Sequence, residues 1–356
     1  MAKSESLAFN YGASDVLGSL RLVPVSYPPL SPTKILVQFV AVPVNPLDFL
    51  VLHGQYPVQA QTRVNDDTGE SYFVPGSDGV ARILEKGAAV SDLQVGDMVI
   101  LRTHCQGTWR THAQLEASDV LRVPSGLDPH HSALLRMGVL PAFFLLQDYH
   151  AMSPGDWILQ NAATGTVSHF VCQIAQLYGL NVASVIRDRA NEDERERTER
   201  SLRCHGAAVV VTESELSTNE ALAGKRIVLG IDFVSDDKLT SAMATVLAPG
   251  ATLLTAGFLA PASAPDVNLR KLLWQQNITL RAFRLSEGLS KRSTELQRAV
   301  IEWLGGLLQR GILTSPLVSY VRWDQLDENR EIVLRHTIQQ AFKGHVGQRK
   351  TILILE

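Results

Sequence analysis

Cysteine is scarce in this chain of 356 residues. The three cysteines, Cys105, Cys172 and Cys204, are too few and too scattered for a disulfide framework or a Cys-x-x-Cys metal site. A reducing compartment fits this composition best.

An excess of charge of either sign is also missing. The 33 Lys and Arg residues stand against 36 Asp and Glu residues, for a formal net charge of −3. A chain without a basic excess is poorly suited to neutralise a phosphate backbone, so we expect no nucleic-acid partner.

Long apolar runs are absent as well. The longest, residues 137–146, contains Pro141 and has about half of the ~20 residues that a bilayer span needs, so we expect no membrane insertion. Residues 1–10 have neither an apolar core nor an Arg-rich amphipathic pattern, so they resemble neither a signal nor a transit peptide.

The length and a hydrophobic content of 45% predict about two globular domains. The first part of the chain is β-rich: short runs at 35–42, 80–86 and 98–103 are separated by turns such as Val95-Gly96-Asp97. From Trp157 onward, strands and helices alternate, which predicts an α/β fold with a doubly wound parallel sheet. The six expected strands are 157–160, 182–186, 208–212, 226–233, 251–256 and 278–283.

The turn-rich Ser153-Pro154-Gly155-Asp156 marks the expected domain boundary. A helix over 293–309 is followed by a β-like segment at 316–323, a helix over 324–342 and a terminal strand at 351–355, and this tail is expected to return to the first domain. We therefore predict one domain from residues 1–152 and 317–356 and a second from 153–316. The alternating charges at 188–200 predict a solvated helix face.

A turn of small residues, Asn161 to Gly165, lies between the first strand of the second domain and its helix. Backbone N–H groups at such a helix start bind pyrophosphate, although Gly165 is a single glycine where a dinucleotide fingerprint has three. The next strand ends in Arg187-Asp188-Arg189. Arginine at this position accommodates a 2′-phosphate, so NADP is favoured over NAD.

These motifs together resemble the medium-chain dehydrogenase/reductase superfamily and, within it, the mitochondrial trans-2-enoyl thioester reductases. The resemblance is carried by Pro43-Val44-Asn45-Pro46-Leu47-Asp48, Gly54-Gln55-Tyr56-Pro57, Pro75-Gly76-Ser77-Asp78-Gly79, Gly107-Thr108-Trp109-Arg110-Thr111, Gln160-Asn161-Ala162 and Val185-Ile186-Arg187-Asp188-Arg189.

The resemblance implies a GroES-like β-rich catalytic domain, a Rossmann domain and NADPH-dependent reduction of 2-enoyl thioesters on CoA or acyl carrier protein. It also implies a mitochondrial location and a homodimer formed through the strand at 278–283. Tyr56 and Asn45 fall on catalytic positions of the family. The residues implied to bind the cofactor are Thr164, Gly165, Thr166, Val167, Arg187, Asp188, Arg189, Ala256, Gly257, Phe258, Leu259, Phe283, Arg284, Leu285, Ser286 and Lys350.

The zinc enzymes of this superfamily carry a Gly-His-Glu ligand motif, and here Ser77 and Asp78 follow Gly76. Serine supplies no imidazole ligand, so we expect no metal. The chain departs from the reductases at Leu140, Phe258 and Arg284, where the family often has Asn, Gly and Trp.

Two other functions remain open. A zinc-free NADPH quinone reductase of the same superfamily would use the same cofactor turn without a catalytic tyrosine. A partner-docking protein could use Leu304-Gly305-Gly306-Leu307-Leu308, an LxxLL pattern, although the same leucine spacing is typical of a helix packed on its own core.

Overall fold

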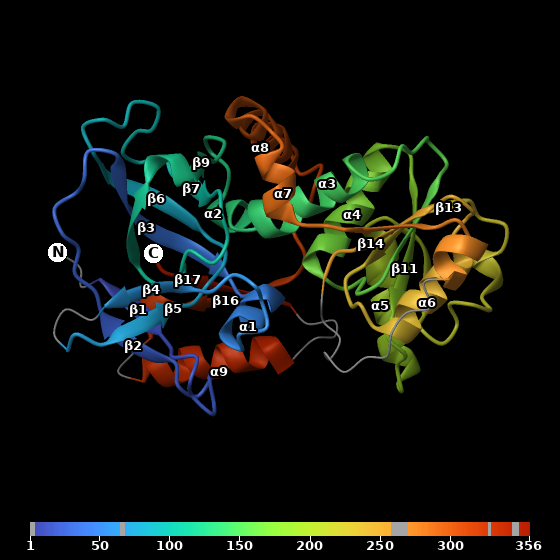
Figure 1. Ribbon diagram of the computed structural model, residues 1–356, viewed down its shortest axis with the longest axis horizontal. Coiled ribbons are helices and arrows are strands. Elements are labelled where there is room, and N and C mark those ends of the chain that lie inside the picture. Colours follow the sequence, from blue (N-terminus) through green and yellow to red (C-terminus); the bar gives the residue numbers. More distant parts are fainter. Residues whose placement is uncertain (1–3, 65–67, 258–269, 327–328, 344–348) are drawn as a thin grey trace. The chain divides into compact units, whose positions relative to one another are not determined.

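The computed structural model describes residues 4–64, 68–257, 270–326, 329–343 and 349–356. The chain divides into two compact units, one formed by Met1–Met137 and Leu289–Glu356 and the other by Gly138–Gly288 (Figure 1). The first unit is therefore discontinuous in sequence, and the second is one continuous segment.

The first unit is built around a sheet in which the described strands follow the order β16-β17-β3-β6-β7-β9, with β8 paired to β3. Strand β3 is central, and its alternating burial places Ile35, Val37 and Phe39 in the core. Its strands are β3 (Lys34–Pro43), β6 (Val80–Lys86), β7 (Met98–Leu101), β8 (His112–Glu116), β9 (Val120–Arg122), β16 (Val318–Arg322) and β17 (Lys350–Ile354).

In the described part of this unit, two small antiparallel sheets and four α-helices complete the structure. The sheets pair β1 (Glu5–Ala8) with β2 (Arg21–Pro24) and β4 (Gln61–Val64) with β5 (Ser71–Val74). The helices are α1 (Pro46–Leu52), α2 (Pro129–Ser132), α8 (Thr294–Gln309) and α9 (Arg330–Lys343). Helices α1 and α9 pack together through Phe49 and Phe342, whose ring centroids are 5.1 Å apart.

The six described strands of the second unit form a sheet in the order β12-β11-β10-β13-β14-β15, and each of these pairs is parallel. This confirms the doubly wound sheet. The strands are β10 (Trp157–Gln160), β11 (Asn181–Ile186), β12 (Ala207–Thr212), β13 (Ile227–Asp232), β14 (Thr252–Thr255) and β15 (Thr279–Ala282). The helices are α3 (Leu140–Gln147), α4 (Thr166–Leu177), α5 (Glu192–Cys204), α6 (Asp237–Val246) and α7 (Leu285–Ser290), the last of which reaches the unit boundary.

The order of strands determines where a ligand can bind in such a sheet. The sequence order reverses between β10 and β13, so the carboxyl ends of these two strands border a crevice. The turn at Asn161 and the end of β13 at Asp232 both lie there.

The compact units differ at both boundaries from the ranges expected from the sequence. Helix α8 packs on the first unit: a Cβ at Gly305 would lie 2.5 Å from Cγ of Pro124, and Arg298 forms an ion pair with Asp92. Helix α3 packs on α4 in the second unit. Residues 138–152 therefore group with the parallel sheet, and residues 289–316 group with the β-rich unit.

The C-terminal helix begins later than expected, at Arg330 instead of Asp324. Residues Trp323–Gln325 form a 3₁₀ turn. The Trp323 side chain is buried, and its indole N–H donates to Oε1 of Glu5 at 2.6 Å, which fixes this turn against the first strand of the chain.

The LxxLL leucines are core residues. Leu304, Leu307 and Leu308 are all buried on the inner face of α8, which confirms the packing role and leaves them unavailable to a partner. Among the described residues, no helix combines the length and the apolar character required to cross a bilayer.

Candidate active site

The start of α1 carries Asn45 in a fixed geometry. Asn45 is the N-cap, Pro46 is the first helical residue, and Asp48 is the third. The buried Asp48 carboxylate accepts a hydrogen bond from the Asn45 backbone N–H at 2.7 Å and another from the Ser77 N–H at 2.7 Å. Asp48 therefore joins the start of α1 to the loop at Ser77.

Lys350 lies beside this helix start, at the first position of β17. Its ammonium donates to the carbonyl oxygen of Val44 at 2.8 Å and to Oδ1 of Asn45 at 2.6 Å. Burial lowers the pKa of Lys350 to about 8, and the charges of Asp48 and Asp78 oppose this shift. Lys350 therefore lies in the first unit, and its ammonium is hydrogen-bonded to the side chain of Asn45, one of the two residues expected to be catalytic.

The Asn45 amide keeps an unused donor. Its Oδ1 is occupied by Lys350, whereas Nδ2 has no hydrogen-bond partner in the described part of the chain. The residue is only 6% exposed. A buried donor without a partner costs about 1–3 kcal/mol, so such a group is a natural contact for a ligand acceptor.

A second buried carboxyl group, Asp78, lies on the loop that follows β5. It accepts hydrogen bonds from the N–H groups of Gly79 at 2.9 Å and Met137 at 3.2 Å. Burial raises the pKa of Asp78 to about 7, although the nearby positive charge of Arg136 opposes the shift. The Arg136 guanidinium is itself buried and donates to the carbonyl oxygen of Arg102 at 3.4 Å.

Tyr56 lies just after α1 and is half-buried. Its ring packs edge-to-face with the imidazole of His104, with centroids 5.5 Å apart. Burial and the charge of Arg136 lower the pKa of His104 to about 4, so this imidazole is neutral at physiological pH. The tyrosine therefore has an uncharged ring beside it.

The Gly-Thr-Trp-Arg-Thr segment has a structural role. Trp109 and Arg110 are both buried, and burial lowers the pKa of Arg110 to about 10. Gly76 has a φ of +99°, and a Cβ there would lie 2.4 Å from the Thr108 hydroxyl. The close approach of these two loops explains why glycine stands at position 76.

No group of three or more His, Cys, Asp and Glu side chains suited to a metal ion occurs among the residues described. Ser77, at the position where the zinc enzymes have a ligand, instead donates its backbone N–H to Asp48.

In the second unit, the turn after β10 leads directly into α4. Ala162 has a φ of +44°, and the Gly165 N–H donates to the Ala162 carbonyl oxygen at 2.8 Å. Gly165 is the N-cap of α4, so the N–H groups of Thr166 and Val167 lie at a helix N-terminus, where they suit an anion. With Thr164, this turn has the donor chemistry that a pyrophosphate needs.

A buried polar network links the ends of β10 and β13. The amide of Asn161 donates to Asp232 at 2.6 Å and accepts from the Phe233 N–H at 2.7 Å, and the Thr240 hydroxyl donates to Asp232 at 2.5 Å. We did not identify Asp232 from the sequence. The sequence feature that could have identified Asp232 is an acidic residue at the end of an apolar strand, β13, which pairs with the strand that leads into the glycine turn.

The loop after β14 is close to the end of β13. Ser235 donates to the Gly257 carbonyl oxygen at 2.6 Å, and a Cβ at Gly257 would lie 2.4 Å from the Phe233 carbonyl oxygen. The Ala256 N–H donates to the carbonyl oxygen of Asp232 at 2.7 Å. The predicted site residues Phe258 and Leu259 lie outside the described residues.

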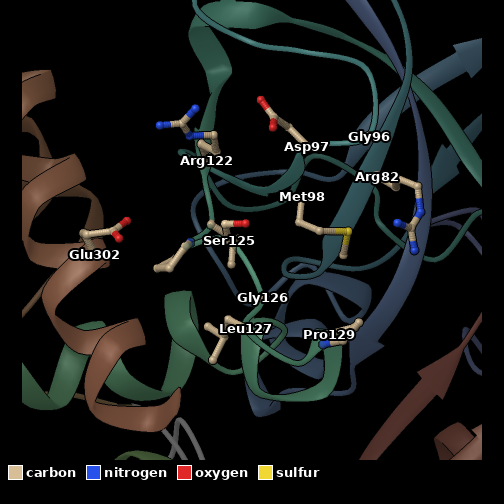
Figure 2. A pocket seen from close by; sticks show the side chains of 12 residues that line it. Arg82, Gly96, Asp97, Met98, Arg122, Ser125, Gly126, Leu127, Pro129 and Glu302 are labelled. Atoms are coloured by element: carbon tan, nitrogen blue, oxygen red, sulfur yellow. The ribbon is translucent and has the colours of Figure 1, made fainter. Parts of the chain in front are cut away.

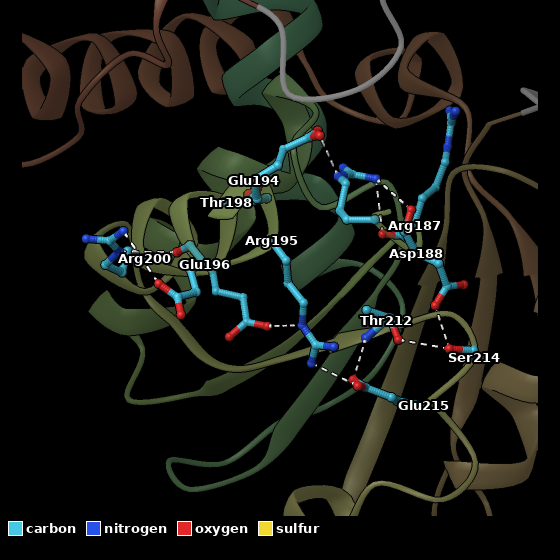
Figure 3. A network of polar contacts seen from close by, with 12 residues as sticks. Arg187, Asp188, Glu194, Arg195, Glu196, Thr198, Arg200, Thr212, Ser214 and Glu215 are labelled. Carbon is cyan, nitrogen blue, oxygen red and sulfur yellow. Dashed lines mark hydrogen bonds and ion pairs between the residues drawn. The ribbon is translucent and has the colours of Figure 1, made fainter. Parts of the chain in front are cut away.

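The three charged residues after β11 have different partners (Figure 3). The Asp188 carboxylate accepts from the Ser214 hydroxyl, which lowers the pKa of Asp188. Arg189 pairs with Glu194 at 3.2 Å and also donates to backbone carbonyl groups. Arg187 is exposed, and its guanidinium has no hydrogen bond or ion pair among the described residues. Arg187 is thus the side chain of the three best able to bind a phosphate.

The charged segment that follows is a solvated helix face, as predicted. Most side chains of α5 are exposed, and Leu202 is its buried residue. Arg195 pairs with Glu199 at 2.9 Å and with Glu215 at 2.8 Å (Figure 3).

The remaining predicted cofactor residues surround the end of β15. Phe283 is half-buried and its N–H donates to the Thr255 carbonyl oxygen at 2.9 Å. Leu285 is buried, Ser286 is half-buried and Arg284 is exposed. The exposed Arg284 side chain is not part of the packed interior.

Figure 2 shows a pocket in the first unit. It is lined by side chains that include Arg82, Asp97, Met98, Arg122 and Glu302. The guanidinium of Arg82 already pairs with Glu356 at 2.8 Å. No predicted site residue lines this pocket.

The buried Asp78 generates a prediction about pH. Its pKa of about 7 lies above the ordinary value of 3.8 for an aspartic acid, so the folded chain binds this proton more tightly than the unfolded chain. The resulting stabilisation is complete below about pH 4 and is lost as the pH rises through 7. We expect the free energy of unfolding to fall between about pH 5 and 7, by up to about 1 kcal/mol per pH unit, and to fall less in Asp78→Asn.

Guanidinium unfolding at a series of pH values measures this slope. Asp92→Asn is the matched control, because Asp92 is an exposed acid of the same unit. Equal slopes in the wild type and Asp78→Asn would contradict the assignment.

Comparisons with known proteins agree with this geometry. Residues 31–127 match the family model of the alcohol dehydrogenase GroES-like domain. The human mitochondrial enoyl-[acyl-carrier-protein] reductase is 31% identical over 291 residues, which cover 80% of this chain and 74% of the relative. An NADPH quinone oxidoreductase of Kluyveromyces marxianus is 29% identical over 94% of this chain and 90% of its own length.

Among solved structures, a complex of Etr1p with NADP and crotonyl-CoA superposes with a TM-score of 0.85, at 25% identity and with full coverage of both chains. Etr1p is a mitochondrial 2-enoyl thioester reductase of Candida tropicalis. Together with the GroES-like unit and the parallel sheet, these similarities show that the chain belongs to the enoyl-[acyl-carrier-protein] reductase family of the medium-chain dehydrogenase/reductase superfamily.

Proposed function

We propose that this protein is an NADPH-dependent reductase of trans-2-enoyl thioesters carried on CoA or acyl carrier protein, acting in fatty-acid synthesis. The observation that carries the proposal is a half-buried phenol, Tyr56, in a family member whose buried Asn45 amide keeps an unpaired N–H donor. These two groups supply hydrogen bonds to a carbonyl oxygen without a metal.

Reduction of the C2–C3 double bond requires a hydride at C3, stabilisation of negative charge on the thioester oxygen and a proton at C2. NADPH supplies the hydride when it is bound. A phenol, with an ordinary pKa of about 10, keeps its proton at neutral pH, so Tyr56 can donate a hydrogen bond to the carbonyl oxygen or the proton to C2. The Nδ2–H of Asn45 is a second donor, available to a carbonyl oxygen of the substrate or of the nicotinamide.

The second unit carries the residues proposed to bind the cofactor. Thr164, Gly165, Thr166 and Val167 would bind the pyrophosphate at the start of α4, and Arg187 would bind the 2′-phosphate, with Arg189 and Asp188 completing this strand end. Ala256 to Leu259 and Phe283 to Ser286 would contact the nicotinamide half. The exposed guanidinium of Arg187 and the engagement of Asp188 with Ser214 support NADPH over NADH.

Tyr56→Phe tests the chemistry. With trans-2-hexenoyl-CoA and NADPH, we expect kcat to fall about 10²–10⁴-fold, because the ring stays and the acidic O–H is lost. Tyr320→Phe is the control, since Tyr320 is an exposed tyrosine of the same unit.

Undiminished turnover in Tyr56→Phe would remove the assigned role. A wild type that oxidises NADPH with a simple quinone but not with the enoyl-CoA would favour the quinone reductase, a function supported by the Kluyveromyces relative.

Arg187→Ala tests the cofactor preference. Loss of one charge-assisted hydrogen bond is worth about 1.5–3 kcal/mol, so the Kd of NADPH should rise about 10–100-fold while that of NADH changes less than about threefold. Fluorescence titration of both cofactors measures this, with Arg200→Ala on the exposed face of α5 as control. An equal loss of affinity for both cofactors would argue against a 2′-phosphate contact.

We also propose a mitochondrial location, because relatives of this chain are mitochondrial enzymes.

A homodimer is proposed through β15, which lies at the edge of the described sheet and has mostly exposed residues, so its backbone is open to pairing with a second copy. Light scattering should give a mass of twice 39.0 kDa, and the mass of a single chain would contradict the dimer.

A further inference from the structure

The orientation of the Asn45 amide is determined by its partner. An asparagine side chain has an acceptor end and a donor end, whereas a lysine ammonium has donors only. The contact of 2.6 Å between Lys350 and Asn45 is therefore made with Oδ1, and Nδ2 is the end left for a ligand. Lys350 is the side chain that holds the Oδ1 end of this amide in the described contacts.

The rest of Asn45 is fixed independently of Lys350. Its backbone N–H binds the Asp48 carboxylate, and its carbonyl oxygen accepts from the Asp48 N–H at 3.0 Å. Loss of the Lys350 ammonium would thus leave the backbone of Asn45 in place and free the side-chain amide to turn over.

We infer that Lys350 is a positioning residue: its ammonium fixes the amide of Asn45 so that Nδ2–H donates to a carbonyl oxygen of the bound ligand. This inference rests on the proposed function and deepens it. It concerns the contact of Lys350 with Asn45 and is distinct from the cofactor contact that the family resemblance implies for Lys350.

Two carbonyl groups of the reaction share the required chemistry, the thioester carbonyl group of the substrate and the carboxamide of the nicotinamide. Binding of NADPH in the absence of substrate separates them. If Asn45 serves the cofactor, Asn45→Ala and Lys350→Met both raise the Kd of NADPH. If it serves the thioester, both leave this Kd unchanged and lower kcat with the enoyl-CoA. Either pattern supports the inference, because the two variants behave alike.

A double-mutant cycle is the decisive experiment. Removal of a positioned donor of this kind lowers kcat/KM about 10²–10³-fold, so Lys350→Met and Asn45→Ala should each cause a loss of at least about tenfold. If Lys350 acts through Asn45, kcat/KM of the double variant should be no more than about threefold below that of the less active single variant. Losses that multiply would overturn the inference and favour a direct contact between Lys350 and the cofactor.

A second variant guards against misfolding, because Lys350→Met removes a buried charge that faces Asp48 and Asp78. Asn45→Asp retains a helix N-cap and an acceptor for Lys350 but lacks the N–H donor. We expect it to fold and to lose as much activity as Asn45→Ala. Wild-type activity in Asn45→Asp would overturn the inference.

Lys86→Met is the matched control, because the Lys86 ammonium also donates to a backbone carbonyl group, that of Leu93 at 2.9 Å, in the same unit. Its kcat/KM should equal that of the wild type.

A readout without substrate distinguishes failure of this inference from failure of the proposed function. In the free protein, the side-chain ¹H–¹⁵N resonances of Asn45 should shift or broaden in Lys350→Met, because the amide loses its fixed orientation. Unchanged resonances would overturn the inference even if the wild type reduces enoyl thioesters. Shifted resonances in a protein that reduces no enoyl thioester would support it and refute the proposed function alone.

Discussion

A carboxylate enclosed by protein needs hydrogen bonds and opposite charge, since its removal from water costs several kcal/mol. Asp48 receives two backbone N–H groups and lies within the field of the Lys350 ammonium. The donors come from the start of α1 and from the Ser77 loop, and the ammonium comes from β17. The buried Asp48 side chain thus joins three segments that are distant in sequence, and the position of Asn45 depends on these contacts.

In the second unit, a buried carboxylate is stabilised by neutral hydrogen-bond donors instead of a nearby ammonium. The buried Asp232 carboxylate accepts from the Asn161 amide, the Thr240 hydroxyl and the N–H groups of Val234 and Ser235. These contacts fix the loops that follow β10 and β13, where the strand order reverses. Loops held in this way would present backbone N–H groups to an anion without rearrangement, which is the physical basis of phosphate binding in such sheets.

Sequence periodicity was sufficient to locate the six parallel strands, because buried strands are continuous apolar runs bounded by turns. It did not determine where α8 packs, because an amphipathic pattern shows that a helix has a buried face but not which core that face contacts. Gly305 and Arg298 lie against the β-rich unit. Motifs located Tyr56, Asn45 and Lys350 individually. The bond between Asn45 and Lys350, residues 305 positions apart, depends on tertiary structure that no local pattern encodes. Likewise, three adjacent charges after β11 look equivalent in sequence, and only their partners single out Arg187.

The discontinuity of the first unit affects the order in which the two units can fold during synthesis. Strand β17 lies between β3 and β16, yet its residues 350–354 follow nearly the whole sequence. During synthesis the continuous second unit has all of its described strands before the first unit can close its sheet, and the part of the β3 edge that pairs with β17, Ala41 to Pro43, stays unpaired in the meantime. An unpaired edge of an apolar strand is prone to association with other chains. Removal of residues 350–356 would therefore take away the strand between β3 and β16 and the Lys350 ammonium in a single step, so solubility and chemistry would be lost together.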